Sequence, residues 1–333
     1  YSVPVPNGIS FVMSLLDVRD LRTSFYTDQG VVHAVDGVSF SVERGKTLGI
    51  VGESGCGKSV TALSVMRLVP ERVGRIESGT VLFDGRDILK LKEREMQNVR
   101  GNSISMIFQD PMTSLNPVFT VGNQIAEVLH LHRKLSAKEA LKIAETMLRQ
   151  VGMPDPHLCV NEYPHRLSGG MRQRVMIAMA LSCKPRLIIA DEPTTALDVT
   201  IQAQILELLM SLQEKHGMSI IMITHNLGVI AEVADDVLVI YAGHVIEENS
   251  VDGLFRNPLH PYTKGLLASV PKLTDKEMSA RLPTIPGSVP DLISLPSGCR
   301  FADRCSDRFE LCERMPDMVD VGGGHRVRCW KYN

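Results

Sequence analysis

A glycine-rich peptide near residue 55 carries chemistry that can be read from residue types and spacing. Residues 52–59 read Gly-Glu-Ser-Gly-Cys-Gly-Lys-Ser, between an apolar run at 47–51 and a second at 60–69. These flanks predict a buried parallel strand before the glycines and a helix after them. In that setting, the N–H groups of the loop and the helix N-terminus cradle the phosphates of a nucleotide. The alternative is a glycine-rich turn that only caps a core helix.

Two polar side chains at the end of the loop extend this to a site for ATP and Mg²⁺. Lys58 is placed to reach phosphate oxygens, and the Ser59 hydroxyl is a ligand for Mg²⁺. The loop residues expected to contact the nucleotide are Gly52, Glu53, Ser54, Gly55, Cys56, Gly57, Lys58, Ser59 and Val60.

Two adjacent acids end another apolar run. Residues 186–190 predict a buried strand, and Asp191 and Glu192 follow it directly. We expect Asp191 to hold Mg²⁺, directly or through water, because this cation prefers carboxylate oxygen. Glu192 is expected on the other side of the strand end, where it can polarise the attacking water. Taken alone, such a run is also compatible with a strand that enters a solvated loop.

A second glycine motif, Leu-Ser-Gly-Gly-Met-Arg-Gln-Arg, occupies residues 167–174 and leads into an expected helix over 172–181. The exposed N–H groups at a helix start attract anions. The phosphate loop, Gln109, this motif, the acid pair and His225 follow one another in this order. With them, the chain resembles the ATPase subunits of ABC transporters from about residue 15 to at least residue 269. The resemblance implies an α/β P-loop cassette in which ATP binds between two copies of the fold.

The resemblance also implies how the second copy completes the site. Ser168, Gly169 and Gly170 would cover the γ-phosphate that the opposite subunit binds, and Asp198 would cross the dimer interface. Taken singly, residues 168–170 are also compatible with a loop before a helix.

Three further roles follow from the same resemblance. Gln109 would sense Mg²⁺ and the attacking water while linking to the membrane partner, and His225 would contact the γ-phosphate. An aromatic side chain would stack on adenine, with Phe25 as the first candidate and Tyr26 as the alternative. Gln109 could instead be an ordinary strand end, and His225 a helix cap.

Segments outside the shared motifs narrow the resemblance to one kind of transporter. Residues 108–117, 257–263, 286–287 and 299–302 are similar to the ATPases of dipeptide and oligopeptide importers. This implies peptides that are captured outside the cell by a binding protein and passed through two membrane permeases. The ATPase would act at the cytoplasmic face of the membrane, as a homodimer or with a related second ATPase.

Two alternatives remain at this stage. Nickel importers share much of the pattern, and soluble ABC-type ATPases act in repair or translation. The chain contains one contiguous cassette, without a tandem copy or a long coiled coil between its halves, which favours a transporter subunit.

Four of the seven cysteines gather near the C-terminal end, with spacers of five, six and sixteen residues. They are Cys299, Cys305, Cys312 and Cys329. In a reducing compartment, clustered thiols favour a metal site over disulfides. Tetrahedral Zn²⁺ and a [4Fe-4S] cluster both take four thiolates, so the spacing does not separate them. Some peptide-importer ATPases carry such a cluster, and this resemblance favours [4Fe-4S], with Zn²⁺ or no metal as alternatives.

Composition agrees with a globular enzyme. Of 333 residues, 44% are hydrophobic, and the net charge of −2 gives no electrostatic reason to expect nucleic-acid binding. No apolar run approaches the roughly 18 residues that cross a bilayer, so membrane attachment is expected through partner proteins. Residues 1–12 precede Met13 and are expected to be a tag.

The expected organisation has a P-loop core over 13–109 and 181–250 and a helical subdomain over 110–180. An extension over 251–298 then leads to the cysteine-rich tail, 299–333. Because the tail has few apolar residues, we expect bound metal to supply its folding energy.

Local patterns predict several elements within this organisation. A capping box at Ser136 and Glu139 predicts a helix that stops at Gly152. Its expected apolar side comprises Ala140, Leu141, Ala144, Met147, Leu148 and Val151. Further expected elements are a helix over 201–215, a strand over 219–223, and a hairpin of 237–241 with 244–248.

Overall fold

The computed structural model describes residues 14–195, 197–270 and 283–333. Two parts of the sequence analysis therefore lie outside the described residues, namely the expected tag at 1–12 and residues 271–282 of the expected extension. Ala196, two residues before Asp198, also lies outside them.

The central sheet has, in the described part of the chain, eight strands in the order β11-β12-β10-β9-β3-β8-β7-β6. Its strands are β3 (Thr47–Val51), β6 (Ile104–Ile107), β7 (Leu187–Asp191), β8 (Ser219–Ile223), β9 (Asp236–Tyr241), β10 (His244–Ser250), β11 (Val319–Asp320) and β12 (Arg326–Val327). Strands β9, β3, β8, β7 and β6 run parallel. All five residues of β3, β7 and β8 are buried, which explains why their sequences are continuous apolar runs without alternation.

A smaller antiparallel sheet, ordered β2-β1-β4-β5, packs beside the central sheet. Its strands are β1 (Leu16–Thr27), β2 (Gly30–Val42), β4 (Gly74–Phe83) and β5 (Arg86–Asp87). One hydrophobic cluster joins this sheet to helix α1 (Lys58–Val65) and to one face of the central sheet. The helix that follows the phosphate loop is therefore held between two sheets.

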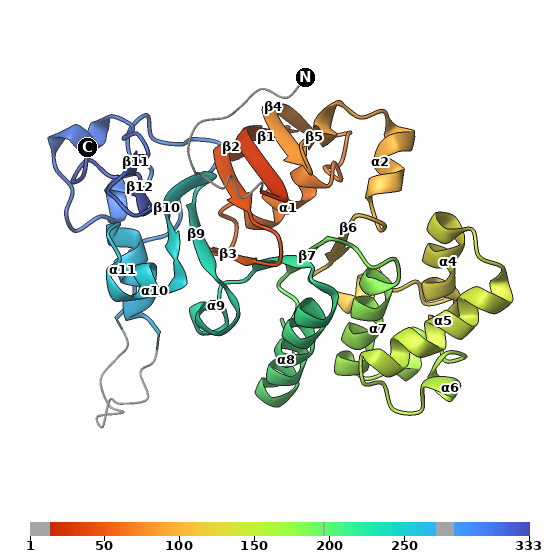
Figure 1. Cartoon of the computed structure of the whole chain (residues 1–333). Coiled ribbons are helices and arrows are strands. Elements are labelled where there is room, and N and C mark those ends of the chain that lie inside the picture. Colours follow the sequence, from red (N-terminus) through yellow and green to blue (C-terminus); the bar gives the residue numbers. More distant parts are fainter. Residues whose placement is uncertain (1–13, 196, 271–282) are drawn as a thin grey trace, which may run out of the picture.

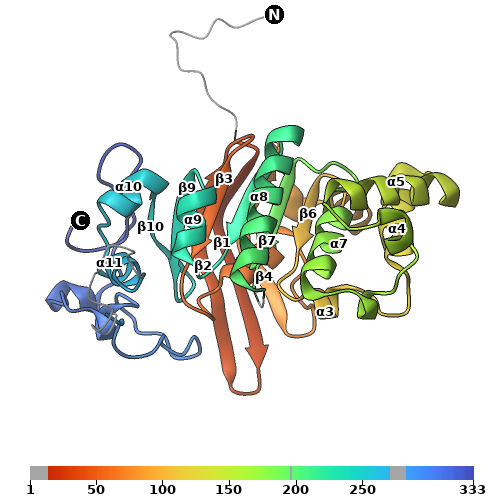
Figure 2. The same ribbon diagram turned by 90° about the horizontal axis from the view of Figure 1, so that it is seen from below.

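Helices cover the opposite face of the central sheet, and the hydrophobic core on that face continues into the helical subdomain. The helices of the described residues are α2 (Glu93–Val99), α3 (Pro111–Ser114), α4 (Val121–Arg133), α5 (Ala137–Gln150), α6 (Pro156–Cys159), α7 (Gly169–Leu181), α8 (Val199–His216), α9 (Leu227–Val233), α10 (Val251–Arg256) and α11 (Pro261–Ala268). Figures 1 and 2 show α4 to α7 at one end of the molecule and the C-terminal tail at the other. Across the described ranges, no helix is both long enough and apolar enough to cross a bilayer.

The structure confirms the helix with the capping box, but one side chain expected on its buried side is exposed. The Ser136 hydroxyl accepts the N–H of Glu139, and the chain turns away at Gly152 with φ of 69°. Leu141 is 37% exposed, although it was expected on the buried side. It lies at the edge of the helix beside Gly122 of α4, which has no side chain to cover it.

Two helix starts also differ from expectation. Helix α1 covers Lys58–Val65 instead of 60–69, because Lys58 and Ser59 form its first turn and Arg67 adopts a φ of 51° beyond its end. Helix α7 begins at Gly169 instead of 172, because the Ser168 hydroxyl caps it by accepting the N–H of Met171 at 3.3 Å.

The cysteine-rich tail is packed into the cassette, which corrects the expectation that metal must supply its folding energy. Strand β12 pairs antiparallel with β10 and so extends the central sheet. Phe301 is 4% exposed and belongs to the main hydrophobic core. The tail therefore gains burial and strand pairing from the cassette itself.

Candidate functional site

A cavity of about 360 Å³ lies at the loops that follow the carboxyl ends of β3, β6 and β7. It is lined by Phe25, Val32, Ala34, Ser54, Gly55, Gly57, Lys58, Ser59, Val60, Gln109, Glu192 and Leu292. The structure thus brings the phosphate loop, one of the two acids and Gln109 to one place, although they are far apart in the sequence.

The backbone of the phosphate loop requires glycine at two positions. Gly52 has φ of 154°, and a Cβ there would lie 2.2 Å from the carbonyl oxygen of Ile240. Gly57 has φ of 104°, and a Cβ there would lie 2.2 Å from the carbonyl oxygen of Ala34. Neighbouring strands press against the loop so closely that only a bare backbone fits.

Lys58 is buried at 5% exposure and lies over this loop. Its Nζ donates to the carbonyl oxygens of Gly52 at 2.8 Å and Glu53 at 3.0 Å. These contacts hold the ammonium group at the cradle, and phosphate oxygens are stronger acceptors for it than neutral carbonyls.

Ser59 and Asp191 meet as a hydroxyl–carboxylate pair. The Ser59 Oγ donates to Asp191 Oδ1 at 2.9 Å, and Asp191 is 5% exposed. Burial raises the pKa of Asp191, while the hydrogen bond from Ser59 opposes the rise. Such oxygens suit a hard cation, so the residues present fit Mg²⁺.

Glu192 is the centre of a second polar group. Its carboxylate accepts hydrogen bonds from Gln109 Nε2 at 3.1 Å and Thr195 Oγ1 at 2.8 Å, and lies 3.2 Å from His225 Nδ1. Burial favours a higher pKa for Glu192, but the hydrogen bonds from Thr195 and His225, with the nearby positive charges, lower it overall. The carboxylate is therefore ionised at neutral pH.

Glu192 also has an unusual backbone. Its φ is 46°, a left-handed conformation that side chains other than glycine rarely adopt. Its N–H donates to the carbonyl of Ile223 at 2.8 Å, which ties this turn to β8 just before His225. The strained turn directs Glu192 toward Gln109 and His225, while Asp191 keeps its contact with Ser59.

The second glycine motif does not line this cavity. Gly170 lies against Ile201, since a Cβ at Gly170 would be 2.8 Å from Ile201 Cγ2, and Gly169 lies near Leu197. Asp198 caps α8 by accepting the N–H of Ile201 at 2.9 Å. Ser168, Gly169, Gly170 and Asp198 thus form a separate region beside the start of α8.

The two aromatic candidates for adenine stacking have different surroundings. Phe25 lines the cavity. Tyr26 is 44% exposed, and its hydroxyl donates to Glu77 at 2.7 Å, outside the cavity lining. The placement favours Phe25 as the stacking residue.

Sequence reasoning missed three lining residues: Val32, Ala34 and Leu292. Val32 and Ala34 belong to β2, whose pairing with β1 places them beside Phe25. Leu292 comes from the C-terminal extension, and its carbonyl accepts the N–H of His33 at 3.4 Å. No local pattern marks Leu292, because its position depends on how the extension packs back on β2.

Comparisons with known proteins agree with this site. A family model described as "ABC transporter" matches residues 35–195, and one described as "Oligopeptide/dipeptide transporter, C-terminal region" matches residues 246–312. The oligopeptide transport ATP-binding protein OppD of Bacillus subtilis is 54% identical over 320 residues, covering 96% of this chain and 89% of the relative. The dipeptide transport ATP-binding protein DppD of the same organism is 53% identical over 317 residues, covering 95% of this chain and 94% of the relative.

A solved structure supports the same assignment. The dimeric post-hydrolysis state of the ATP-binding cassette MJ0796, bound to ADP and Pi, matches with a TM-score of 0.64 and 26% identity. The match covers 71% of this chain and 98% of that cassette. Since the sequence relatives match nearly end to end, the chain belongs to the oligopeptide and dipeptide transport ATP-binding proteins of the ABC transporter family.

Proposed function

We infer that this chain is the ATPase that energises import of dipeptides and oligopeptides through an ABC transporter. The observation that carries the inference is the pairing of a complete phosphate-loop site with the C-terminal region typical of peptide transporters, at 246–312. The first feature supplies ATP chemistry, and the second distinguishes this chain from cassettes in general. The near-full-length similarity to peptide-transport relatives supports the same conclusion.

The site residues divide the reaction into binding and water activation. Lys58 and the loop N–H groups would bind the β- and γ-phosphates, and Ser59 with Asp191 would hold Mg²⁺. Mg²⁺, when bound, neutralises charge on the phosphate oxygens. Glu192 would accept a proton from the attacking water, because its pKa is lowered and its carboxylate is ionised.

Gln109 and His225 would orient that water and the γ-phosphate. Both lie within hydrogen-bonding distance of the Glu192 carboxylate, at 3.1 and 3.2 Å. In the free chain these contacts fix the carboxylate, and ATP would replace one or both. The arrangement supports the role that the resemblance assigns to each residue.

ATP would also join two cassettes. Ser168, Gly169, Gly170 and Asp198 lie away from the cavity of their own chain and are available to a second ATPase subunit. The N–H groups of residues 168–170, at the start of α7, suit an anion such as the γ-phosphate. We propose closure of a homodimer or heterodimer on ATP and its separation after hydrolysis.

This cycle would drive two transmembrane permeases from the cytoplasmic face of the membrane. An extracytoplasmic binding protein would deliver the peptide, so the partners are proteins and not nucleic acid. Copurification from detergent-solubilised membranes, followed by uptake of a labelled dipeptide and tripeptide, tests this function. We expect two polytopic proteins in the complex and peptide uptake that depends on this chain.

Other outcomes of this experiment would assign the cassette to a different kind of ABC ATPase. Nickel uptake without peptide uptake would identify a nickel importer. Tight binding to ribosomes or DNA, with no membrane partner, would contradict transport and support a soluble ABC-type ATPase.

We further propose a [4Fe-4S] cluster on Cys299, Cys305, Cys312 and Cys329, with Zn²⁺ as the alternative. Among the described residues, the His, Cys, Asp and Glu side chains form no ready-made group of three or more that could hold a metal. Burial, together with the neighbouring Cys312, Cys329 and Cys305, raises the pKa of Cys299 to about 11.

Backbone N–H groups lie close to three of these cysteines. Burial raises the pKa of each thiol, while the N–H groups of Phe301, Asp307 and Lys331, each two residues after a cysteine, oppose the rise. Hydrogen bonds to ligand sulfur support metal–thiolate bonding. In the proposed cluster, these N–H groups would donate to the ligand sulfurs.

Metal analysis tests the cluster. We expect anaerobically purified protein to contain about four iron atoms and matching acid-labile sulfide per chain, and Cys312→Ser to lose them. Ser306→Ala is the control, because Ser306 is exposed and is not a proposed ligand, so this variant should retain the iron. One zinc per chain without iron would establish the alternative, and protein that binds neither metal would contradict the proposal.

A further inference from the structure

A short segment of the C-terminal tail lies against the phosphate loop. It runs from Cys299 to Cys305 and places Phe301 among the buried rings of Tyr241, Tyr262 and His260. The ring centroids of Phe301 and these three residues are 5.2 to 5.7 Å apart. This packing fixes the side chains on either side of Phe301 relative to the cassette.

Arg304, in the same segment, forms a bidentate ion pair with Glu53 of the phosphate loop. Its Nη1 lies 2.6 Å from Glu53 Oε2, and its Nη2 lies 2.9 Å from Glu53 Oε1. The Arg304 side chain is 6% exposed and that of Glu53 is 27% exposed. The guanidinium is further held by the Pro286 carbonyl at 2.9 Å and by the Tyr241 hydroxyl at 3.3 Å.

The remaining polar groups of Glu53 are also occupied. Its N–H donates to the hydroxyl of Tyr262 at 2.9 Å, and Tyr262 is fully buried. Its carbonyl accepts Lys58 Nζ at 3.0 Å and the N–H of Cys56 at 3.3 Å. Glu53 therefore connects the tail on one side with the phosphate-binding lysine on the other.

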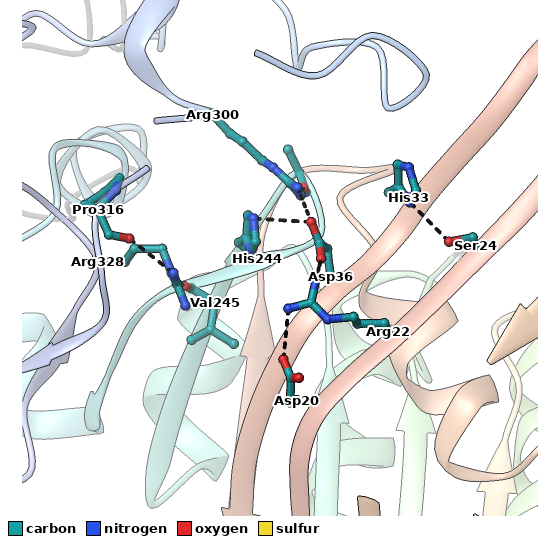
Figure 3. Close-up of polar contacts among 11 residues, drawn as sticks. Asp20, Arg22, Ser24, His33, Asp36, His244, Val245, Arg300, Pro316 and Arg328 are labelled. Atoms are coloured by element: carbon teal, nitrogen blue, oxygen red, sulfur yellow. Dashed lines mark hydrogen bonds and ion pairs between the residues drawn. The ribbon is translucent and has the colours of Figure 1, made fainter. Parts of the chain in front are cut away.

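A second arginine of the segment supports the other end of the loop. In Figure 3, Arg300, His244 and Arg22 converge on Asp36 of β2, and Arg300 also donates to the Ala242 carbonyl. The next residue, Gly243, donates its N–H to the carbonyl of Cys56 at 2.9 Å. The segment thus touches the loop at Glu53 and, through the turn after β9, at Cys56.

We propose that Arg304 is a positioning residue of the ATPase site, which neutralises and fixes Glu53 so that the phosphate loop accepts the triphosphate. The proposal rests on the proposed function, because it takes residues 52–59 as the nucleotide site. It gives the C-terminal region, which otherwise marks only the transporter family, a part in ATP binding that acts through Glu53.

The physical reason is the position of the Glu53 carboxylate. It is attached to the loop that must surround an anion, and Lys58 already contacts the same residue. Without Arg304, the carboxylate would repel the phosphates and compete for the ammonium group of Lys58. A bidentate guanidinium removes both effects, because it balances the charge and fixes the direction of the carboxylate.

Paired substitutions in the full chain test this proposal. We expect Arg304→Gln to weaken binding of Mg-ADP and of a non-hydrolysable Mg-ATP analogue roughly tenfold, measured by calorimetry. Because the uncompensated Glu53 carboxylate causes the loss, Glu53→Gln combined with Arg304→Gln should restore affinity to within about twofold of the unsubstituted chain. The melting temperature of each variant separates this rescue of affinity from a rescue of folding, because the unpaired Glu53 carboxylate also costs stability.

The control is Arg308→Gln in the same tail, whose ion pair with Asp303 is exposed and includes no residue of the loop. It should leave both affinities unchanged, and melting temperatures measured without nucleotide report folding separately. Unchanged affinity in Arg304→Gln would overturn the proposal. Equal weakening in the single and double variants would overturn it as well, since Arg304 would then act through the tail and not through Glu53. If the unsubstituted chain bound neither nucleotide, the ATPase function itself would fail, and this inference with it.

Discussion

Glu192→Gln is expected to bind Mg-ATP normally but to hydrolyse it roughly 100- to 10,000-fold more slowly, the usual contribution of a positioned general base. The amide keeps the size of the side chain but cannot accept the proton of the attacking water. It also replaces one of the two accepting oxygens with an NH2 group that only donates. Because separation of the two cassettes follows hydrolysis, the variant should accumulate as an ATP-bound dimer. Phosphate release under single-turnover conditions and light scattering with and without ATP measure the two effects.

A matched control is available on α8. Glu207→Gln changes an exposed acid outside the cavity, so both its turnover and its response to ATP should equal those of the unsubstituted chain. Hydrolysis by Glu192→Gln at the unsubstituted rate would remove Glu192 from its assigned role. A dimer that forms equally well without nucleotide would argue against ATP as the link between the cassettes.

The parts of the site that the sequence predicts are those specified by local chemistry. Strands β3 and β7 are buried on both faces, so their apolar runs are continuous and their ends are easily located. Gly52 and Gly57 meet backbone atoms so closely that their identity is fixed by the loop conformation. The capping box of α5 is equally local, because Ser136 and Glu139 satisfy each other's backbone groups.

The choice between Phe25 and Tyr26 shows where local reasoning ends. Neighbouring residues of a strand face opposite sides of a sheet, so one of the two had to face the cavity. Which one depends on the register of β1, and that register shifts within the strand, between Thr23 and Ser24. A one-residue shift exchanges the faces, and the sequence alone does not reveal it.

Contacts made by the C-terminal region were beyond sequence analysis for a different reason. Leu292 lines the cavity and Arg304 pairs with Glu53, yet both are more than 200 residues after the phosphate loop in the sequence. Their positions depend on tertiary packing, namely the pairing of β12 with β10 and the buried rings around Phe301. The cysteines drew attention to this tail as a metal site, while its arginines provide the contacts with the nucleotide loop.

Lys58→Ala is expected to act one step earlier than Glu192→Gln, by weakening Mg-ATP binding itself roughly 10- to 100-fold. Lys58 is 5% exposed and its ammonium group lies at the cradle. Hydrogen bonds to charged groups contribute about 1.5–3 kcal/mol each. Without nucleotide, Lys58 bonds to the neutral carbonyls of Gly52 and Glu53 and contacts the Cys56 sulfur at 4.0 Å, so the loss should appear mainly in affinity. Calorimetric titration with Mg-ATP measures it.

The two variants together separate binding from hydrolysis. Lys58→Ala should stay monomeric at ATP concentrations that saturate the dimer of Glu192→Gln, because the phosphates that attract the second cassette are absent. Lys142→Ala, on the exposed side of α5, should match the unsubstituted chain in both assays. If Lys58→Ala instead bound Mg-ATP with unchanged affinity, the phosphates would have to lie elsewhere than on residues 52–59. The composite site built from Ser168 to Gly170 of a second cassette would then lose the anion that it is proposed to cover.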